Sequence, residues 1–365
     1  MKAGSRSFRW AASMTLARLT LAWLTLALGV IVLAGAQNAA APADPPAFST
    51  EMLDSMAQLP GELSALPKPP EPAENPQSAA KIELGRLLFH DKRISSDRSI
   101  SCATCHDSDK AYSDGRKKAV GINRKVLPRR SPSLLNSAYN SSQFWDGRAR
   151  SLEEQSAAPM LARDEMGMLD PHSIIAHLEE DAEYRRRFQD AFGRDINMED
   201  IQRAIAAFER TLVTPDSAFD RYIGGDKQAL TLRQKRGLIL FFGKAACTEC
   251  HNGPNFTDNK FHSLGLLPGE LPDADVGRFA VTGDAADRHA FKTPSLRSAA
   301  YESAYMHDGS IATLAGVIDF YVQGGGSGPK SKLVFKLQLT ESEKEDLLAF
   351  LQSLAGRMPE EGHRR

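Results

Sequence analysis

All four cysteines of this 365-residue chain fall in two C-x-x-C pairs, and a histidine follows each pair directly. C-x-x-C-H is the attachment motif of c-type haem. Two thiols at this spacing lie on one helical turn, where each can form a thioether with a haem vinyl group, and the next imidazole then reaches the iron. We therefore predict two covalently bound haem c groups, whose anchors and proximal iron ligands are Cys102, Cys105 and His106 in the first motif and Cys247, Cys250 and His251 in the second.

Three other uses of cysteine pairs fit the sequence less well. The pairs of a zinc ribbon lie about 15 to 20 residues apart, whereas 142 positions separate Cys105 from Cys247. A thioredoxin-type redox pair needs a βαβ context, which this sequence lacks. Two simple disulfides would leave both following histidines unexplained. Haem attachment accounts for all six residues.

Residues 1–36 have the pattern of an export signal. They carry four basic residues and no acidic one, and the uncharged apolar run 19–36 ends in Ala34-Gly35-Ala36, the small residues that signal peptidase favours. The alternative is an uncleaved N-terminal anchor, because the run of 18 residues can just span a bilayer. Both interpretations place the rest of the chain outside the cytoplasm. We expect a periplasmic protein that contacts the membrane only if this segment is retained.

The charge balance excludes one class of partner. The chain has 45 Lys and Arg against 46 Asp and Glu, without the basic excess of a nucleic-acid-binding protein. Removal of the four basic residues of the export segment changes the net charge from −1 to −5. An acidic mature protein suits a basic partner protein.

The organisation after residue 36 changes twice. Residues 37–76 contain nine of the 20 prolines, which predicts a tether or an extended strap over the surface. A break within 214–225 then divides the rest into two parts, each with one cysteine pair, so we predict haem domains at 77–215 and 216–358. We expect a mostly α fold with long loops and little β-structure. This rests on helical spacing of apolar residues, as at Met198, Ile201, Ile205, Phe208 and Leu212, and on a capping box formed by Thr340 and Glu343.

Several motifs in a fixed order resemble the bacterial dihaem cytochrome c peroxidases and the MauG-type dihaem enzymes. They are ELGRLLFHDKRIS, SCATCH, RRSPSLLNSAYNSSQFWDGRARSLEEQ, the segment 159–166, GLILFFGKAACTECH, FKTPSLR, YMHDG and IDFYVQGG. The resemblance runs from about Asn75 to Gly356. It implies two cytochrome c-type haem domains packed against each other, the first peroxidatic and the second transferring electrons.

The resemblance also implies catalytic roles for three residues. Trp145 matches the tryptophan between the two haems, although a large aromatic side chain that fills a domain interface is the simpler interpretation. Glu165 matches the distal carboxylate, which moves the peroxide proton as a general acid and base. Without the resemblance, Glu165 would be predicted to be a solvated surface acid. Gln155 matches the partner of that carboxylate and can donate a hydrogen bond to peroxide.

Two positions depart from the plain peroxidase pattern. Many relatives carry a distal histidine on the first haem, but the corresponding segment AVGINRKVLPRR has none. The first haem is therefore expected to be five-coordinate and ready for peroxide, as in MauG. Where the peroxidases place the methionine ligand of the second haem, this chain has Tyr321. Periodicity alone predicts Tyr321 as a core residue; the resemblance to MauG predicts a phenolate ligand, and Met306 is the competing ligand.

The resemblance also points to one further cofactor, a calcium ion. The peroxidases bind one calcium ion between their domains, through an asparagine that aligns with Arg130 and through carbonyls near Glu302 and Ala304. Arginine cannot replace that ligand, so the sequence leaves calcium unassigned.

Three functions fit two haems in an exported chain. The first is a peroxidase that reduces hydrogen peroxide with electrons from a small c-type cytochrome or another periplasmic donor. The second is a MauG-like oxidase that uses peroxide to oxidise a side chain of a partner protein. The third is a dihaem electron carrier whose irons are both six-coordinate. The resemblance favours an enzyme and leaves the electron donor open.

Overall fold

The computed structural model describes residues 63–267 and 275–360, which all lie within one compact unit of the chain. The predicted export segment and residues 37–62 of the predicted tether lie outside the described residues. Within the two described ranges, no helix is both long and apolar enough to cross a membrane.

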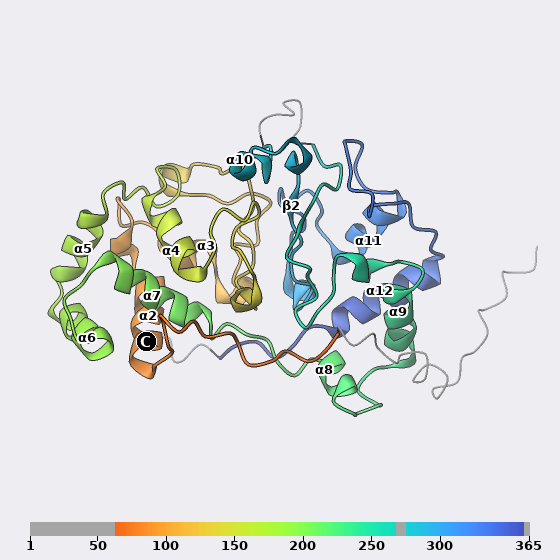
Figure 1. Ribbon diagram of the computed structural model, residues 1–365, viewed down its shortest axis with the longest axis horizontal. Helices are drawn as coiled ribbons and strands as arrows, with labels where there is room; N and C mark the ends of the chain where they lie inside the picture. Colours follow the sequence, from red (N-terminus) through yellow and green to blue (C-terminus); the bar gives the residue numbers. More distant parts are fainter. Residues whose placement is uncertain (1–62, 268–274, 361–365) are drawn as a thin grey trace, which may run out of the picture. The chain divides into compact units, whose positions relative to one another are not determined.

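The described chain is mostly helical, as predicted (Figure 1). The helices of the first half are α2 (Ala79–His90), α3 (Cys102–Cys105), α4 (Leu152–Leu161), α5 (Pro171–Glu179), α6 (Ala182–Phe192) and α7 (Met198–Glu209). Those of the second half are α8 (Ala218–Ile223), α9 (Leu232–Phe242), α10 (Phe279–Thr282), α11 (Leu314–Val322) and α12 (Glu341–Ser353). The short strands β1 (Phe261–His262) and β2 (Phe291–Lys292) pair antiparallel, with Phe261 opposite Lys292. Short 3₁₀ turns lie at Lys92–Ile94, Ser108–Lys110, Ile122–Arg124, Ser137–Tyr139, Cys247–Glu249, Ala285–Asp287 and Ala299–Tyr301.

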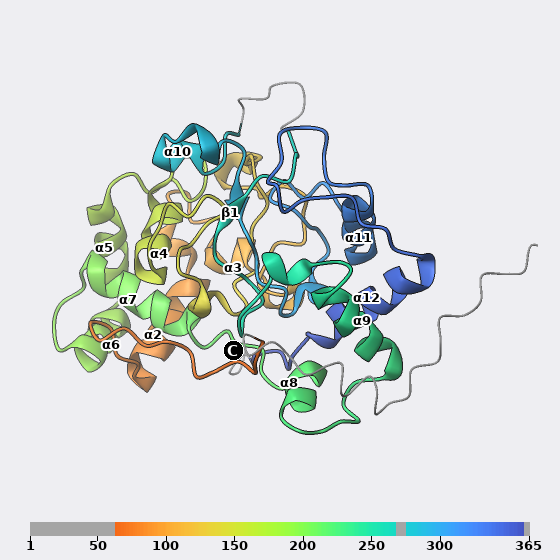
Figure 2. The same cartoon turned by 45° about the vertical axis from the view of Figure 1, so that its right-hand side comes forward.

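Each half has a core built on one close pair of helices. In the first, α2 packs on α7, and a Cβ atom on Gly85 would collide with the carbonyl of Ala204. In the second, α9 packs on α12, and a Cβ atom on Gly237 would collide with the carbonyl of Asp346. Both pairs lie side by side in Figures 1 and 2. In each half, therefore, a glycine lets two helix backbones approach closely.

Local sequence explains where these helices begin. The side chain of Asn197 accepts a hydrogen bond from the backbone N–H of Asp200 at 2.9 Å and caps α7. The predicted capping box at α12 is confirmed, because Thr340 and Glu343 each accept a hydrogen bond from the other's backbone N–H. The predicted apolar face of α7 is buried at Ile201, Ile205 and Phe208.

An internal repeat relates residues 130–159 of the first half to residues 292–321 of the second, at an offset of 162 positions. Asn136 and Ser298 both have left-handed backbones, with φ of 61° and 63°, directly before the turns Ser137–Tyr139 and Ala299–Tyr301. Phe144 and Met306 repeat this match, with φ of 68° and 67°. The same offset pairs Trp145 with His307, Arg130 with Lys292, and Pro159 with Tyr321.

Hydrogen bonds that obey this repeat join the halves. The backbone N–H of Arg130 donates to the carbonyl oxygen of His307 at 3.0 Å, and the backbone N–H of Lys292 donates to that of Trp145 at 2.8 Å. The two bonds are equivalent under the repeat, because Arg130 matches Lys292 and His307 matches Trp145. The segments that carry Trp145 and His307 are thus fixed against each other.

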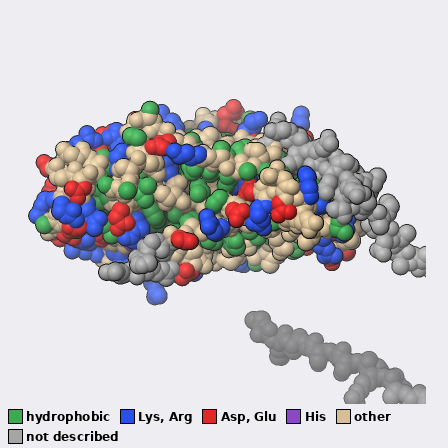
Figure 3. Space-filling model, turned by 90° about the horizontal axis from the view of Figure 1, so that it is seen from below, with side chains coloured by type: hydrophobic (Ala, Val, Ile, Leu, Met, Phe, Trp, Pro, Cys, Tyr) green, Lys and Arg blue, Asp and Glu red, His purple; other side chains and the backbone are tan. Residues whose placement is uncertain are grey.

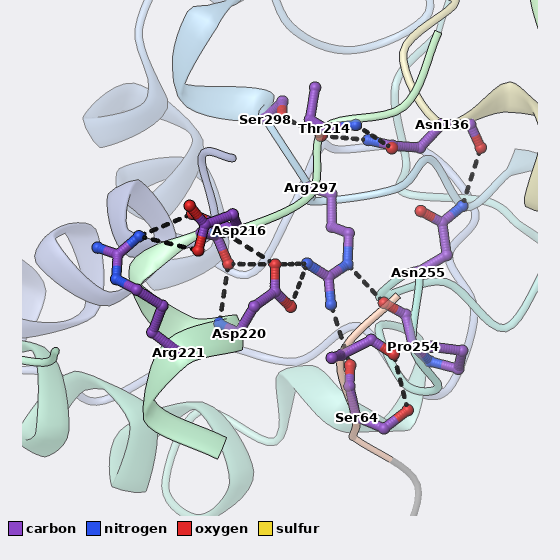
Figure 4. A network of polar contacts seen from close by, with 12 residues as sticks. Ser64, Asn136, Thr214, Asp216, Asp220, Arg221, Pro254, Asn255, Arg297 and Ser298 are labelled. Atoms are coloured by element: carbon purple, nitrogen blue, oxygen red, sulfur yellow. Dashed lines mark hydrogen bonds and ion pairs between the residues drawn. The ribbon is translucent and has the colours of Figure 1, made fainter. Parts of the chain in front are cut away.

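The connection between the halves passes through a buried polar network (Figure 4). Thr214 is fully buried, and its Oγ1 lies 2.8 Å from Nδ2 of Asn136 and 2.7 Å from Oγ of Ser298, the two repeat-related residues. Arg297, whose side chain is also buried, forms an ion pair with Asp220 at 2.9 Å. The domain boundary at 215/216 remains a prediction, and this network lies directly beside it.

The described end of the proline-rich segment lies along both halves as an extended strap, with no helix or strand in residues 63–76. Leu63 is buried in the core of the second half, and the carbonyl oxygen of Ser64 accepts a hydrogen bond from Arg297 at 3.0 Å. At the other end, Asn75 is fully buried and donates to the Glu153 carboxylate in the first half at 2.8 Å. On the face shown in Figure 3, basic and acidic side chains are interspersed around hydrophobic ones.

Candidate functional site

A cavity of about 540 Å³ is lined by residues of both halves. The first C-x-x-C-H motif lies on its wall. So do five other residues singled out by the sequence: Trp145, Gln155, Glu165, Arg130 and Glu302. The structure therefore gathers in one cavity residues that lie up to 200 positions apart in the chain.

The local fold of the first motif leaves one ring nitrogen of His106 available to bind a metal ion. Cys102 and Cys105 form the single turn α3, and the side chain of Thr104 accepts a hydrogen bond from the backbone N–H of Ser101 at 2.9 Å. Nδ1 of His106 lies 3.0 Å from the carbonyl oxygen of Tyr112. Since a carbonyl can only accept, Nδ1 carries the hydrogen and Nε2 keeps its lone pair for a metal.

The second motif repeats this arrangement. Cys247 begins a 3₁₀ turn, and Nδ1 of His251 lies 3.0 Å from the carbonyl oxygen of Phe256. Burial lowers the pKa of His251, as it does that of His106. Both imidazoles are therefore held neutral, the form that binds a metal ion.

The thiols of both motifs are partly buried. All four cysteines lie in the described residues, and none forms a disulfide. Burial raises the pKa of Cys102 and raises that of Cys105 to about 11. A neutral sulfur is thus favoured at each position, and a thioether to haem is neutral.

Glu165 faces the cavity on a loop just after α4. Its backbone N–H donates to the carbonyl oxygen of Ala162 at 3.1 Å, and its own carbonyl accepts from Ile122 at 2.8 Å. Burial raises the pKa of the Glu165 carboxyl, and Arg148 opposes this in part. The simpler prediction of a solvated surface acid is wrong, because the side chain is half-buried and lines the cavity. Gln155, on α4, lines the same cavity.

Trp145 lies where the two halves meet. Its Nε1 donates to the carbonyl oxygen of Arg130 at 3.2 Å, and its own carbonyl oxygen accepts from Lys292 of β2. The indole is half-buried on the cavity wall. This position is compatible with both predicted roles, the filling of an interface and the passage of an electron between two haems.

Tyr321 lies on α11 beside the second cysteine pair. Burial raises the pKa of its phenol, and the nearby thiols of Cys247 and Cys250 raise it further. In the repeat it corresponds to Pro159, which lines the cavity over the first motif. Its competitor Met306 is half-buried and has a left-handed backbone. The choice of ligand between the two stays a prediction.

One buried acid of the site was not predicted from the sequence. Glu209 ends α7, is 3% exposed and lines the cavity, and its Oε2 has no hydrogen-bond partner. Burial raises the pKa of its carboxyl to about 8. The available signal was its spacing of four from Ile205, which places a glutamate in the apolar face of the helix.

Comparison with known proteins gives consistent results. The family described as "Di-haem cytochrome c peroxidase" matches residues 79–228. A methylamine utilization protein MauG of Methylorubrum extorquens is 43% identical over 288 residues, covering 78% of this chain and 81% of that protein. The cytochrome-c peroxidase IdrP1 of a Pseudomonas species is 40% identical over 341 residues, covering 85% and 89%.

A solved structure is similar over much of the chain. It is the crystal structure of a MauG-like protein associated with microbial copper homeostasis, with 38% identity and a TM-score of 0.74, covering 82% of this chain and 95% of that one.

Proposed function

Because the chain belongs to the di-haem cytochrome c peroxidase family, we propose that it is an enzyme that reduces hydrogen peroxide with electrons from a c-type cytochrome. The observation that carries this proposal is the convergence of the first haem-attachment motif, Glu165, Gln155 and Trp145 on one cavity. Reduction of one peroxide to two waters consumes two electrons and two protons. The site must therefore deliver both.

The residues present fit a haem at each C-x-x-C-H motif. Cys102 and Cys105 supply the sulfurs at the first motif, and Cys247 and Cys250 at the second. One unpartnered donor, Oγ of Ser137, lines the cavity, where it can hold a negatively charged haem carboxylate. When bound, the first haem supplies an iron that takes up peroxide and promotes cleavage of the O–O bond.

Glu165 is the proton carrier of this proposal. It accepts the proton from the peroxide oxygen nearer the iron and returns it to the oxygen that departs as water, so one carboxylate serves as base and then as acid. Its half-buried position supports this role, since burial raises its pKa toward the range in which it can do both. Gln155 donates a hydrogen bond that orients peroxide but carries no proton.

Trp145 is the proposed route for electrons between the halves. Its indole lines the cavity of the first motif, while its backbone is bonded to β2 of the second half. A haem bound at the second motif would receive the electrons, and its protein ligands would set its potential. We assign Tyr321 as one of these ligands together with His251, supported by its place beside Cys247 and Cys250.

We place the enzyme in the periplasm, where a c-type cytochrome is available as donor. The basis is the export pattern of residues 1–36. Near −5 without that segment, the net charge suits a basic donor protein.

A MauG-like oxidation of a partner protein is the second candidate. Two observations favour it: the absence of histidine from residues 119–130, which leaves the first haem open without prior reduction, and tyrosine rather than methionine at position 321. A phenolate ligand stabilises ferric haem and favours storage of an oxidising equivalent over rapid uptake of electrons.

Spectra and turnover of the isolated holoprotein test these proposals. We expect one high-spin and one low-spin ferric haem, a spectral response to peroxide, and peroxide-dependent oxidation of reduced cytochrome c. Two low-spin haems without a response to peroxide would identify an electron carrier instead. A response to peroxide without turnover of any reduced small cytochrome would favour the second candidate.

A further inference from the structure

Arg130 is a buried cation at the junction of the two halves. Its side chain is 4% exposed and forms an ion pair with Glu302 of the second half. Burial lowers the pKa of the guanidinium to about 10, so the group remains charged at neutral pH. A permanent positive charge is therefore enclosed between the halves.

Carboxylates of both halves act on this cation. Asp114, of the first half, is 6% exposed, and its charge raises the pKa of the Arg130 guanidinium against the effect of burial, while Glu302 forms the ion pair. The backbone of Arg130 is also fixed, because its N–H donates to His307 and its carbonyl accepts from Nε1 of Trp145. The residue thus ties the first half to the second through its side chain and its main chain together.

The internal repeat places a second buried basic residue at the matching position. Lys292 corresponds to Arg130, is 8% exposed, and lines the same cavity. Its backbone N–H makes the matching bond across the junction, to Trp145. A buried cation at this place is therefore a feature of the repeated unit.

The arrangement does not fit the calcium ion that the resemblance raises. Calcium takes oxygen ligands, whereas a guanidinium has only N–H donors and no lone pair to offer. Its positive charge also repels a divalent cation placed beside Glu302. Arg130 therefore cannot complete the calcium ligand set to which an asparagine at this position would contribute.

We propose that the Arg130 guanidinium is a built-in cation that neutralises Asp114 and Glu302 and holds the two halves together without calcium. The same charge acts on Trp145, since the guanidinium carbon lies 5.9 Å from the centre of the indole ring. It favours the neutral ring by a cation–π contact and opposes a positive charge on it. The electrostatic setting of Trp145 is therefore permanent rather than dependent on a bound ion.

This inference goes beyond the proposed function, and its test does not use turnover. Holoprotein is dialysed against EGTA and analysed for calcium, and its thermal unfolding is then followed in EGTA and in millimolar CaCl₂. We expect no bound calcium and the same Tm in both solutions. Arg130→Asn, which leaves Asp114 and Glu302 unopposed, is expected to lower the Tm in EGTA by roughly 5 °C or more, with partial recovery in CaCl₂.

Two further variants keep the test decisive. Arg130→Lys retains the charge, and its Tm should stay insensitive to calcium even if it is lower. Arg150→Asn, at a side chain that is 91% exposed, serves as the matched control and should behave like the wild type. The proposal is overturned if the wild type holds one equivalent of calcium, if EGTA lowers its Tm and CaCl₂ restores it, or if Arg130→Lys becomes responsive to calcium. An Arg130→Asn variant as stable as the wild type in EGTA would overturn it as well.

Discussion

The backbone N–H of Lys292 donates to the carbonyl oxygen of Trp145 at 2.8 Å, across the junction of the two halves. The indole of Trp145 meanwhile lines the cavity of the first haem-attachment motif. Trp145 therefore contacts the second half through its backbone and the cavity of the first motif through its side chain.

Glu165→Gln should slow the reaction with peroxide about 10²- to 10⁴-fold, because the amide cannot accept and return the proton. In the wild type, the rate should fall as pH decreases through a pKa above 4.5, the ordinary value, since protonation removes the base. The variant should lose this inflection. Stopped-flow spectra between pH 4 and 8 measure both effects, and Glu154→Gln, at an exposed acid of α4, is the matched control. An inflection that persists in Glu165→Gln would assign the proton transfer to another group.

Trp145→Phe should slow electron transfer between the haems while leaving peroxide uptake at the first haem intact. The substitution also removes the hydrogen bond from Nε1 to Arg130, at a cost of about 1 kcal/mol in stability. Tyr139→Phe is a suitable control, because it removes one hydrogen bond, to the carbonyl of Pro67, away from the cavity. Rapid mixing of reduced enzyme with peroxide separates the two steps. Equal electron-transfer rates in both variants would contradict the role of Trp145.

Tyr321→Phe should abolish the low-spin ferric signal of the second haem, because phenylalanine offers no ligand to the iron opposite His251. Met306→Leu should leave that signal unchanged. Electron paramagnetic resonance of the ferric proteins distinguishes the two. The opposite result, loss in Met306→Leu alone, would make Met306 the ligand and the second haem an electron-entry site of higher potential.

Glu209 should make the protein less stable as pH rises. Its pKa is about 8 in the fold, against the ordinary 4.5 when unfolded, so unfolding releases a proton between these values and stability falls with pH across that window. Glu209→Gln should reduce this pH-dependent loss of unfolding free energy by up to about 5 kcal/mol. Urea unfolding at pH 5 and pH 9 measures the difference, with Glu199→Gln, at an exposed acid of the same helix, as control. Parallel pH profiles for wild type and Glu209→Gln would show that Glu209 is ionised in the fold.

Gly85→Ala and Gly237→Ala should each destabilise the protein by about 3 kcal/mol, because the new methyl group meets a backbone carbonyl of the facing helix. Gly224→Ala, at the end of α8 where the backbone is right-handed helical, should change stability by less than about 1 kcal/mol. Thermal unfolding of the three holoproteins compares them. Similar losses at all three positions would argue against close helix contact at Gly85 and Gly237.

The features that short-range pattern predicts are those found in the structure. The capping box of Thr340 and Glu343 and the apolar face of α7 depend on residues three or four positions apart, and both are confirmed. Each haem-attachment motif is also local, since it spans five consecutive residues, and haem attachment there stays a prediction. Glu165 shows where pattern alone fails. Arg163 and Asp164 before it are charged and exposed, while Gly121 and Ile122, more than 40 positions away in the sequence, pack against its loop.

By itself, the sequence determined the two attachment motifs, the predominance of helices and the residues that the resemblance assigns to chemistry. Tertiary structure alone decided that Trp145 and His307 occupy matching places, that Glu209 is enclosed, and that Arg130 and Lys292 are buried cations across one junction. The physical reason is the distance along the sequence over which each feature is determined. A cap or an apolar stripe is fixed by bonds within one turn, whereas the burial of a charge depends on which distant segments surround it, as with Arg130 and Glu302, which are 172 positions apart.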